Sequence, residues 1–64
     1  MERERVIARS DDGAALLSVV TLVDGATRHR YRIVGGEHDG AEFATLGEVA
    51  SYATVHGIEF TDAG

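Results

Sequence analysis

The chain contains no cysteine, no proline, no tryptophan and no lysine among its 64 residues, and only two tyrosines and two phenylalanines. Without cysteine, neither a disulfide framework nor a thiolate metal site contributes to its stability. A chain of this length buries only about 60% of the surface that its unfolded state exposes. We therefore expect a single domain over residues 1–64, with a core small enough that association with a partner is favoured.

Long apolar runs are also missing. The longest, from Leu16 to Val23, contains Ser18 and Thr21 and is far shorter than the ~20 residues of a membrane-spanning helix. Glu and Arg alternate at the N-terminus, and no apolar core typical of a secretory signal follows them. The sequence therefore predicts a cytoplasmic protein that does not associate with membranes.

Three Asp-Gly dipeptides divide the chain, and the second of them predicts a β-hairpin. Asp24-Gly25 lies between two stretches rich in strand-forming residues, 14–23 and 26–34. This dipeptide supplies the two positive-φ positions of a type I′ turn. A two-residue loop places Leu16 opposite Ile33, and the same register gives the hairpin one apolar face.

The second half of the chain predicts one helix between short strands. Thr45 and Glu48 form a capping box, and Gly57 is a natural left-handed terminator, so a helix is expected over 46–56. Short strands are expected at 4–9, 41–44 and 58–60. The fold class is thus α+β: a small antiparallel sheet of three to five strands with one helix packed on one face, in the order β-β-β-(β)-α-β.

The predicted core combines the hairpin face with one helix stripe. Residues at helical spacing, from Leu46 through Val49 and Ala50 to Ala53, form that stripe. The expected core residues are Val6, Leu16, Val20, Leu22, Tyr31, Ile33, Phe43, Leu46, Val49, Ala53, Ile58 and Phe60.

Charge is distributed unevenly along the chain. The net charge is −5, yet residues 33–64 hold six carboxylates and no Lys or Arg, whereas three arginines alternate along 28–32. The two-residue period of a strand places Arg28, Arg30 and Arg32 on one face, beside Leu17 and Val19. This face is either a solvated surface or a row of guanidinium groups that recognises carboxylates or phosphates. The acidic charge of the chain favours a protein surface over nucleic acid.

The acidic half also allows two interpretations. Its carboxylates either keep a small protein in solution or dock onto a basic partner. That partner is a second copy of the chain, through its arginines, or a nucleic-acid-binding protein.

Motifs for catalysis or metal binding are weak. Glu37-His38-Asp39 is the one compact cluster of possible ligands, and three consecutive residues do not converge on one ion without His29 or His56. No serine has a nucleophile context, and His56 suits the C-terminal end of a helix dipole. We expect no enzymatic activity, no catalytic residues, no metal and no cofactor.

The sequence therefore predicts a non-enzymatic protein-interaction module or inhibitor that docks through charge-complementary surfaces. A phage-encoded inhibitor of a host defence complex that binds nucleic acid fits this profile. The expected assembly is a homodimer, and the expected partner is a protein that is basic or binds nucleic acid. A regulator that binds nucleic acid through its arginines is the alternative. The predicted partner-binding residues are Leu17, Val19, Arg28, Arg30, Arg32, Glu37, Asp39, Glu42 and Glu48.

Overall fold

A computed structural model describes residues 1–63 and confirms the predicted fold class. A single antiparallel sheet of five strands carries one helix, and the sheet order is β4-β3-β2-β1-β5. The elements in chain order are β1 (Glu2–Ser10), β2 (Ala15–Val23), β3 (Ala26–Val34), β4 (Glu42–Phe43), α1 (Leu46–His56) and β5 (Phe60–Asp62).

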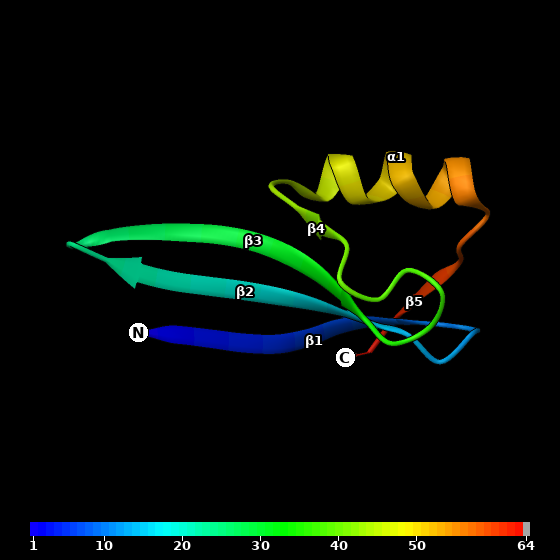
Figure 1. The fold of residues 1–64 in the computed structure, drawn as a ribbon, viewed down its shortest axis with the longest axis horizontal. Coiled ribbons are helices and arrows are strands. Elements are labelled where there is room, and N and C mark those ends of the chain that lie inside the picture. The colour runs from blue at the N-terminus through cyan, green and yellow to red at the C-terminus, as the bar shows by residue number, and fades with distance from the viewer. Residues whose placement is uncertain (64) are drawn as a thin grey trace.

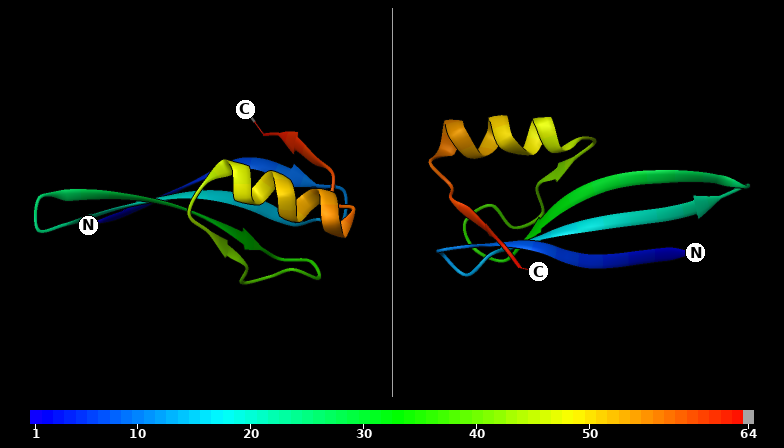
Figure 2. Two further views of the ribbon diagram at one scale, coloured as in Figure 1. Left: turned by 90° about the horizontal axis from the view of Figure 1, so that it is seen from above. Right: turned by 180° about the vertical axis from the view of Figure 1, so that it is seen from behind.

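The first three strands form a long meander, and the helix covers only one end of it (Figure 1). β4 and β5 flank that same end, and they pair with only a few residues of β3 and β1. The molecule is 37 Å long, whereas a helix of 11 residues spans about 16 Å. The other end of the meander therefore projects beyond α1 as a three-stranded arm (Figure 2). The arm begins where β4 pairs with Tyr31 and Arg32, and the strand registers assign to it residues 2–6, 17–23 and 26–32.

The hairpin between β2 and β3 has the predicted register. Asp24 and Gly25 take φ values of 51° and 77°, as a type I′ turn requires. Leu16 pairs with Ile33, and Val19 pairs with Arg30. Residues of even number on β2 thus face the helix together with odd-numbered residues of β3, and this side of the sheet is called the helix face below.

A β-bulge in β1 changes which of its residues reach the core. Val6 pairs with Leu17, but Ala8 pairs with Leu16, so Ile7 is an extra residue in the strand. The bulge moves Ala8 onto the helix face and leaves Val6 on the opposite one. The prediction of Val6 as a core residue of the helix face was therefore wrong, because the bulge gives that place to Ala8.

The helix has the predicted bounds and caps. The Thr45 hydroxyl accepts from the Glu48 N–H at 3.2 Å, and the Glu48 carboxylate accepts from the Ala44 N–H at 2.9 Å. At the other end Gly57 is left-handed, and the Ile58 N–H donates to the Ala53 carbonyl at 2.9 Å. The contacts of the Glu48 N–H and the Ala53 carbonyl satisfy backbone groups that the helix ends leave without partners.

The core lies between α1 and the covered end of the sheet. Leu22 and Leu46 were predicted to be buried, but they are 47% and 53% exposed. Leu22 is exposed because the arm extends beyond the helix, and the helix buries Val49 rather than Leu46. The core cluster contains Ala8, Ala14, Leu16, Ile33, Phe43 and Val49, with Ile7, Tyr31, Ala41, Tyr52 and Phe60 packed against it.

Among the residues that the structure describes, no helix combines the length and apolar character needed to cross a bilayer.

Candidate functional site

The side of the arm opposite the helix face carries three rows of side chains. The β3 row holds Arg28, Arg30 and Arg32, and the strand register places aliphatic or hydroxyl side chains of β2 directly opposite them. Glu2 and Glu4 of β1 form the third row. We call this side the arginine face; it consists of Glu2, Glu4, Leu17, Val19, Thr21, Arg28, Arg30 and Arg32.

Arg32 is held within the protein by two carboxylates. Its guanidinium lies 3.5 Å from Glu4 and 3.6 Å from Glu42. Because Arg32 lies opposite Leu17 and Glu4 lies opposite Val19, the first ion pair crosses β2 diagonally. Val19 is only 3% exposed although no helix covers it. We interpret Arg32 as a structural residue whose stem helps to cover β2.

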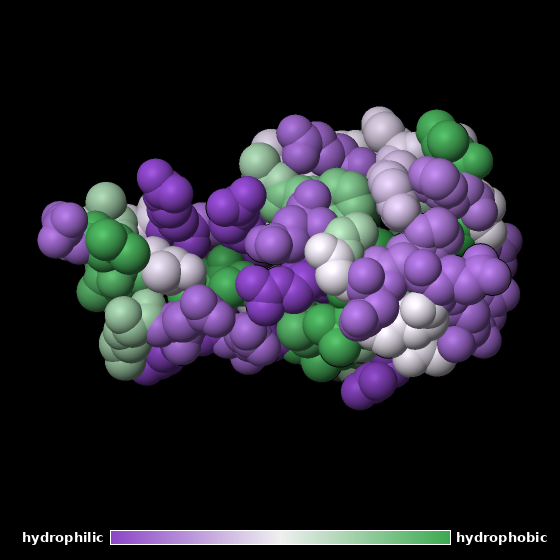
Figure 3. Space-filling view, viewed as in Figure 1, coloured by the Kyte–Doolittle hydropathy of each residue, from purple (hydrophilic) through white to green (hydrophobic). Residues whose placement is uncertain are grey.

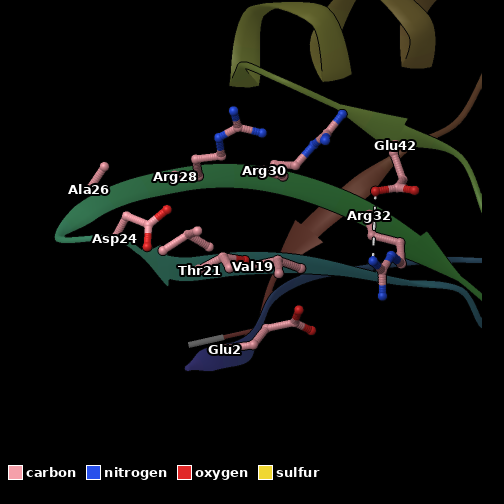
Figure 4. A pocket seen from close by; sticks show the side chains of 10 residues that line it. Glu2, Val19, Thr21, Asp24, Ala26, Arg28, Arg30, Arg32 and Glu42 are labelled. Carbon is pink, nitrogen blue, oxygen red and sulfur yellow. Dashed lines mark ion pairs between the residues drawn. The ribbon is translucent and has the colours of Figure 1, made fainter.

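Arg28 and Arg30 differ from Arg32 in being exposed on the free part of β3. Neither takes part in an ion pair within residues 1–63. Figure 4 shows them next to each other on β3, with both guanidinium groups directed away from β2. They line a hollow of about 620 Å³ together with Val19 and Thr21.

Carboxylates surround the two arginines. Glu2, Asp24 and Glu42 line the same hollow (Figure 4), so it is bordered by groups of both signs of charge. Strongly hydrophilic side chains rise from the arm in Figure 3, and an apolar group lies at its tip. Met1, Leu22 and Val23 are exposed in this part of the molecule. Any ligand of this surface would therefore meet arginines on β3 and carboxylates around them.

The predicted acidic residues are used mainly within the protein. Asp39 accepts a hydrogen bond from the Gly35 N–H at 2.7 Å, Glu42 pairs with Arg32, and Glu48 caps the helix. Glu37 is exposed on the loop after β3. The structure thus brings Glu42 to the arginine face together with the predicted Leu17, Val19 and arginines, and places the other three carboxylates elsewhere.

The structure also assembles an aromatic cluster that the sequence did not predict. The His38 ring nitrogen Nδ1 lies 2.8 Å from the Tyr52 hydroxyl, and the His56 ring lies 4.2 Å from that of Tyr52 and 5.0 Å from that of His38, centroid to centroid. Phe43 packs against Tyr52 at 5.1 Å. The spacing of Tyr52 and His56 along the helix is the one sequence signal for this cluster. The contacts of His38 with Tyr52 and His56 connect the loop after β3 to α1.

Potential metal ligands do not converge in the described part of the chain. No group of three or more His, Asp or Glu side chains there is arranged to hold an ion. Within Glu37-His38-Asp39, His38 contacts Tyr52 whereas Asp39 bonds the Gly35 backbone. The arginine face is therefore the candidate functional site.

Comparisons with known protein families, with curated proteins and with solved structures gave no match.

Proposed function

We propose that the chain is a non-enzymatic protein-interaction module that binds an acidic protein segment through Arg28 and Arg30. The observation that carries this proposal is the contrast among the three arginines of β3. Arg32 is neutralised by Glu4 and Glu42, whereas Arg28 and Arg30 are exposed side by side without a carboxylate partner in residues 1–63. Two adjacent guanidinium forks suit carboxylate groups, which they bind with paired hydrogen bonds.

The charges around the two arginines favour protein over nucleic acid. Glu2, Asp24 and Glu42 line the same hollow, and a phosphate backbone, which carries a charge at every nucleotide, would bring phosphates close to them. The net charge of −5 repels any acidic ligand at longer range, and it repels a polyphosphate more than a segment with carboxylates only opposite Arg28 and Arg30. A protein segment can place its own charges to match this pattern, which a uniformly charged backbone cannot do.

We place the interface on the arginine face rather than on the acidic half. Asp39, Glu42 and Glu48 already accept hydrogen bonds or pair with an arginine within the protein. Binding a basic partner through them would compete with the contacts that hold the loop, β4 and the helix start. The proposed partner is thus acidic, and an inhibitor of a larger complex would act by occupying such a segment.

A double charge reversal tests this proposal. Arg28→Glu with Arg30→Glu should weaken binding of a fluorescent glutamate-rich peptide, measured by anisotropy at ~50 mM salt, by about tenfold or more, or ~1.4 kcal/mol. The matched control is Arg3→Glu with Arg5→Glu. These residues pair with Val20 and Ser18, so they change the same charge on the helix face of the same arm.

Duplex DNA and single-stranded RNA of similar length serve as competing probes. If nucleic acid binds and the reversal of Arg28 and Arg30 removes it, the chain is the alternative regulator and the protein-binding proposal fails. Equal loss of peptide binding in the control variant would also count against the proposal, because the arginine face would then have no special role.

A further inference from the structure

We infer that the acidic segment binds as an extended strand added to the free edge of β3. This inference rests on the proposed function and specifies its geometry: the backbone of the partner pairs with Thr27 and His29, and alternate carboxylates meet Arg28 and Arg30. Strand addition of this kind derives affinity from main-chain hydrogen bonds and specificity from alternate side chains.

The edge of β3 is open over most of the arm. β4 pairs only with Tyr31 and Arg32 of β3, and within residues 1–63 no strand pairs with the outer side of 26–30. Figure 2 shows this part of the hairpin extending beyond α1. The open segment is five residues long, which approaches the length of an ordinary strand.

The backbone of this segment alternates between inward and outward groups. The Ile33 N–H donates outward to the Ala41 carbonyl, and the Ile33 carbonyl accepts from the Gly40 N–H. Because the direction alternates along an antiparallel strand, Thr27 and His29 also direct their N–H and C=O groups outward. Arg28 and Arg30 direct theirs toward β2. Two residues of β3 therefore present unpaired backbone groups to an added strand.

The side chains beside this edge define what the added strand carries. Residues of an added strand that lie opposite Arg28 and Arg30 point to the arginine face, since opposite residues share a face. Alternate residues of a strand are about 6.6 Å apart on that face. An extended segment with acidic side chains at alternate positions would thus place one carboxylate beside each guanidinium. The residues of the segment between these acidic positions would lie opposite Thr27 and His29 and point to the helix face.

Pairing of like edges between two copies is disfavoured by the same side chains. Two antiparallel copies of β3 related by a two-fold axis at residues 28–30 would place Arg opposite Arg, and two copies of β1 would place Glu opposite Glu and Arg opposite Arg. β1 of one copy can place Glu2 and Glu4 beside the arginines of another copy, but such head-to-tail contacts generate rings or open filaments rather than a dimer. β1 also carries Arg3 and Arg5 between its glutamates, so we assign the edge to a different chain that is acidic.

A proline at an outward position tests the edge directly. His29→Pro removes an outward N–H without removing a β2–β3 hydrogen bond, a replacement that edge strands tolerate. The control His29→Val keeps the N–H. The probe is a capped peptide of alternating Glu and Thr, with a block peptide of the same composition as its comparison. We expect the alternating peptide to bind at least about tenfold more tightly than the block peptide, and His29→Pro to remove that advantage while His29→Val retains it.

Modification of the peptide provides a second measurement on the unaltered protein. N-methylation of the backbone amides that face β3 should abolish binding, whereas methylation of the alternate amides should not.

The outcomes distinguish this inference from the proposed function. If binding requires Arg28 and Arg30 but is unchanged by both His29→Pro and N-methylation, strand addition is overturned and the proposed function stands. If binding is unchanged both in the Arg28 and Arg30 variant and in His29→Pro, the proposed function itself is overturned. Concentration-dependent oligomers that are lost in His29→Pro, with no peptide binding, would assign the edge to a second copy instead and overturn this inference.

Discussion

Asp12 stabilises the connection between two loops at the covered end of the sheet. Its carboxylate accepts hydrogen bonds from the Ser10 hydroxyl and, at 3.1 Å, from the Ala14 N–H. The hydrogen bond from Ser10 is the main reason that the pKa of Asp12 lies below its usual value, followed by the bond from Ala14. Gly36 lies against the same carboxylate, because a Cβ there would be 2.6 Å from Asp12 Oδ2. The ionised form of Asp12 is thus favoured in the folded state.

The lowered pKa predicts how stability depends on pH. Since the folded pKa lies below the ordinary value of 3.8, the contribution of Asp12 is fully present above that value and is lost as the pH falls through the folded pKa. We expect Asp12→Asn to lower the thermal midpoint slightly at pH 7, and the difference from the unaltered protein to vanish at low pH. Asp11→Asn is the control, as it removes the same charge from the neighbouring residue. Equal curves for both variants at every pH would contradict this prediction.

The helix depends on one buried residue to hold it on the sheet. Val49 is 4% exposed and belongs to the core cluster, whereas Val55 on the same helix is 79% exposed. The Tyr52 ring adds contacts with His38 and Phe43. Because the helix is short and has a glycine in its first turn, its own backbone hydrogen bonds do not maintain it without this packing.

Truncation of Val49 should therefore destabilise the whole domain. We expect Val49→Ala to lower the free energy of unfolding by about 1–3 kcal/mol through lost packing and a small cavity. In a domain of this size, each kcal/mol corresponds to a decrease of about 4–8 °C in the thermal midpoint. Val55→Ala removes the same atoms from an exposed position, so its midpoint should be nearly unchanged. Similar decreases in both variants would show that the helix contributes only its intrinsic propensity.

Elements that depend on local signals were predictable from the sequence. The Asp24-Gly25 turn fixed the hairpin register, and Thr45 and Gly57 marked the ends of α1 because they satisfy backbone groups nearby in the chain. The bulge at Ile7 was not predictable, since it depends on how β1 pairs with β2. β5 begins at Phe60 rather than at residue 58. Its position depends likewise on pairing with β1 across the chain.

The candidate site was also predictable only in part from the sequence. The two-residue period of a strand was sufficient to place Arg28, Arg30 and Arg32 on one face. The difference between them was not visible in the sequence, because it depends on Glu4 and Glu42 reaching Arg32 from two other strands. The contact of His38 with Tyr52 also joins residues that are distant in the chain. Such pairs require the complete sheet order.

At the scale of the whole molecule, the two ends of the sheet differ in what protects them. The helix, β4 and β5 surround one end, and most of the arm extends beyond them (Figure 1). The core cluster lies at the covered end, whereas Leu22 and Val23 are exposed on the arm, where Val19 is the one buried residue. We expect local stability to follow the same division.

Amide hydrogen exchange should reveal this division residue by residue. Backbone amides of the central strand β2 near Leu16 should exchange most slowly. On the arm, the amides of Thr27 and His29 should exchange rapidly, because they are directed outward, whereas those of Arg28 and Arg30 should be slower. NMR measurement at neutral pH would resolve the alternation. Slow exchange at Thr27 and His29 would mean that another surface already covers this edge.

β4 ends at Phe43 because Thr45 caps the helix that follows, so the chain leaves the edge of β3 after two paired residues. The number of residues before this cap therefore determines how much of β3 remains available. Two or three extended residues inserted after Ala44 would continue β4 alongside Arg30 and His29. The lengthened β4 would then compete with the proposed ligand for the edge of β3. An insertion at this point would thus act as an autoinhibitory segment whose strength depends on its length. Variants of the chain that differ only there should differ in their affinity for the proposed strand.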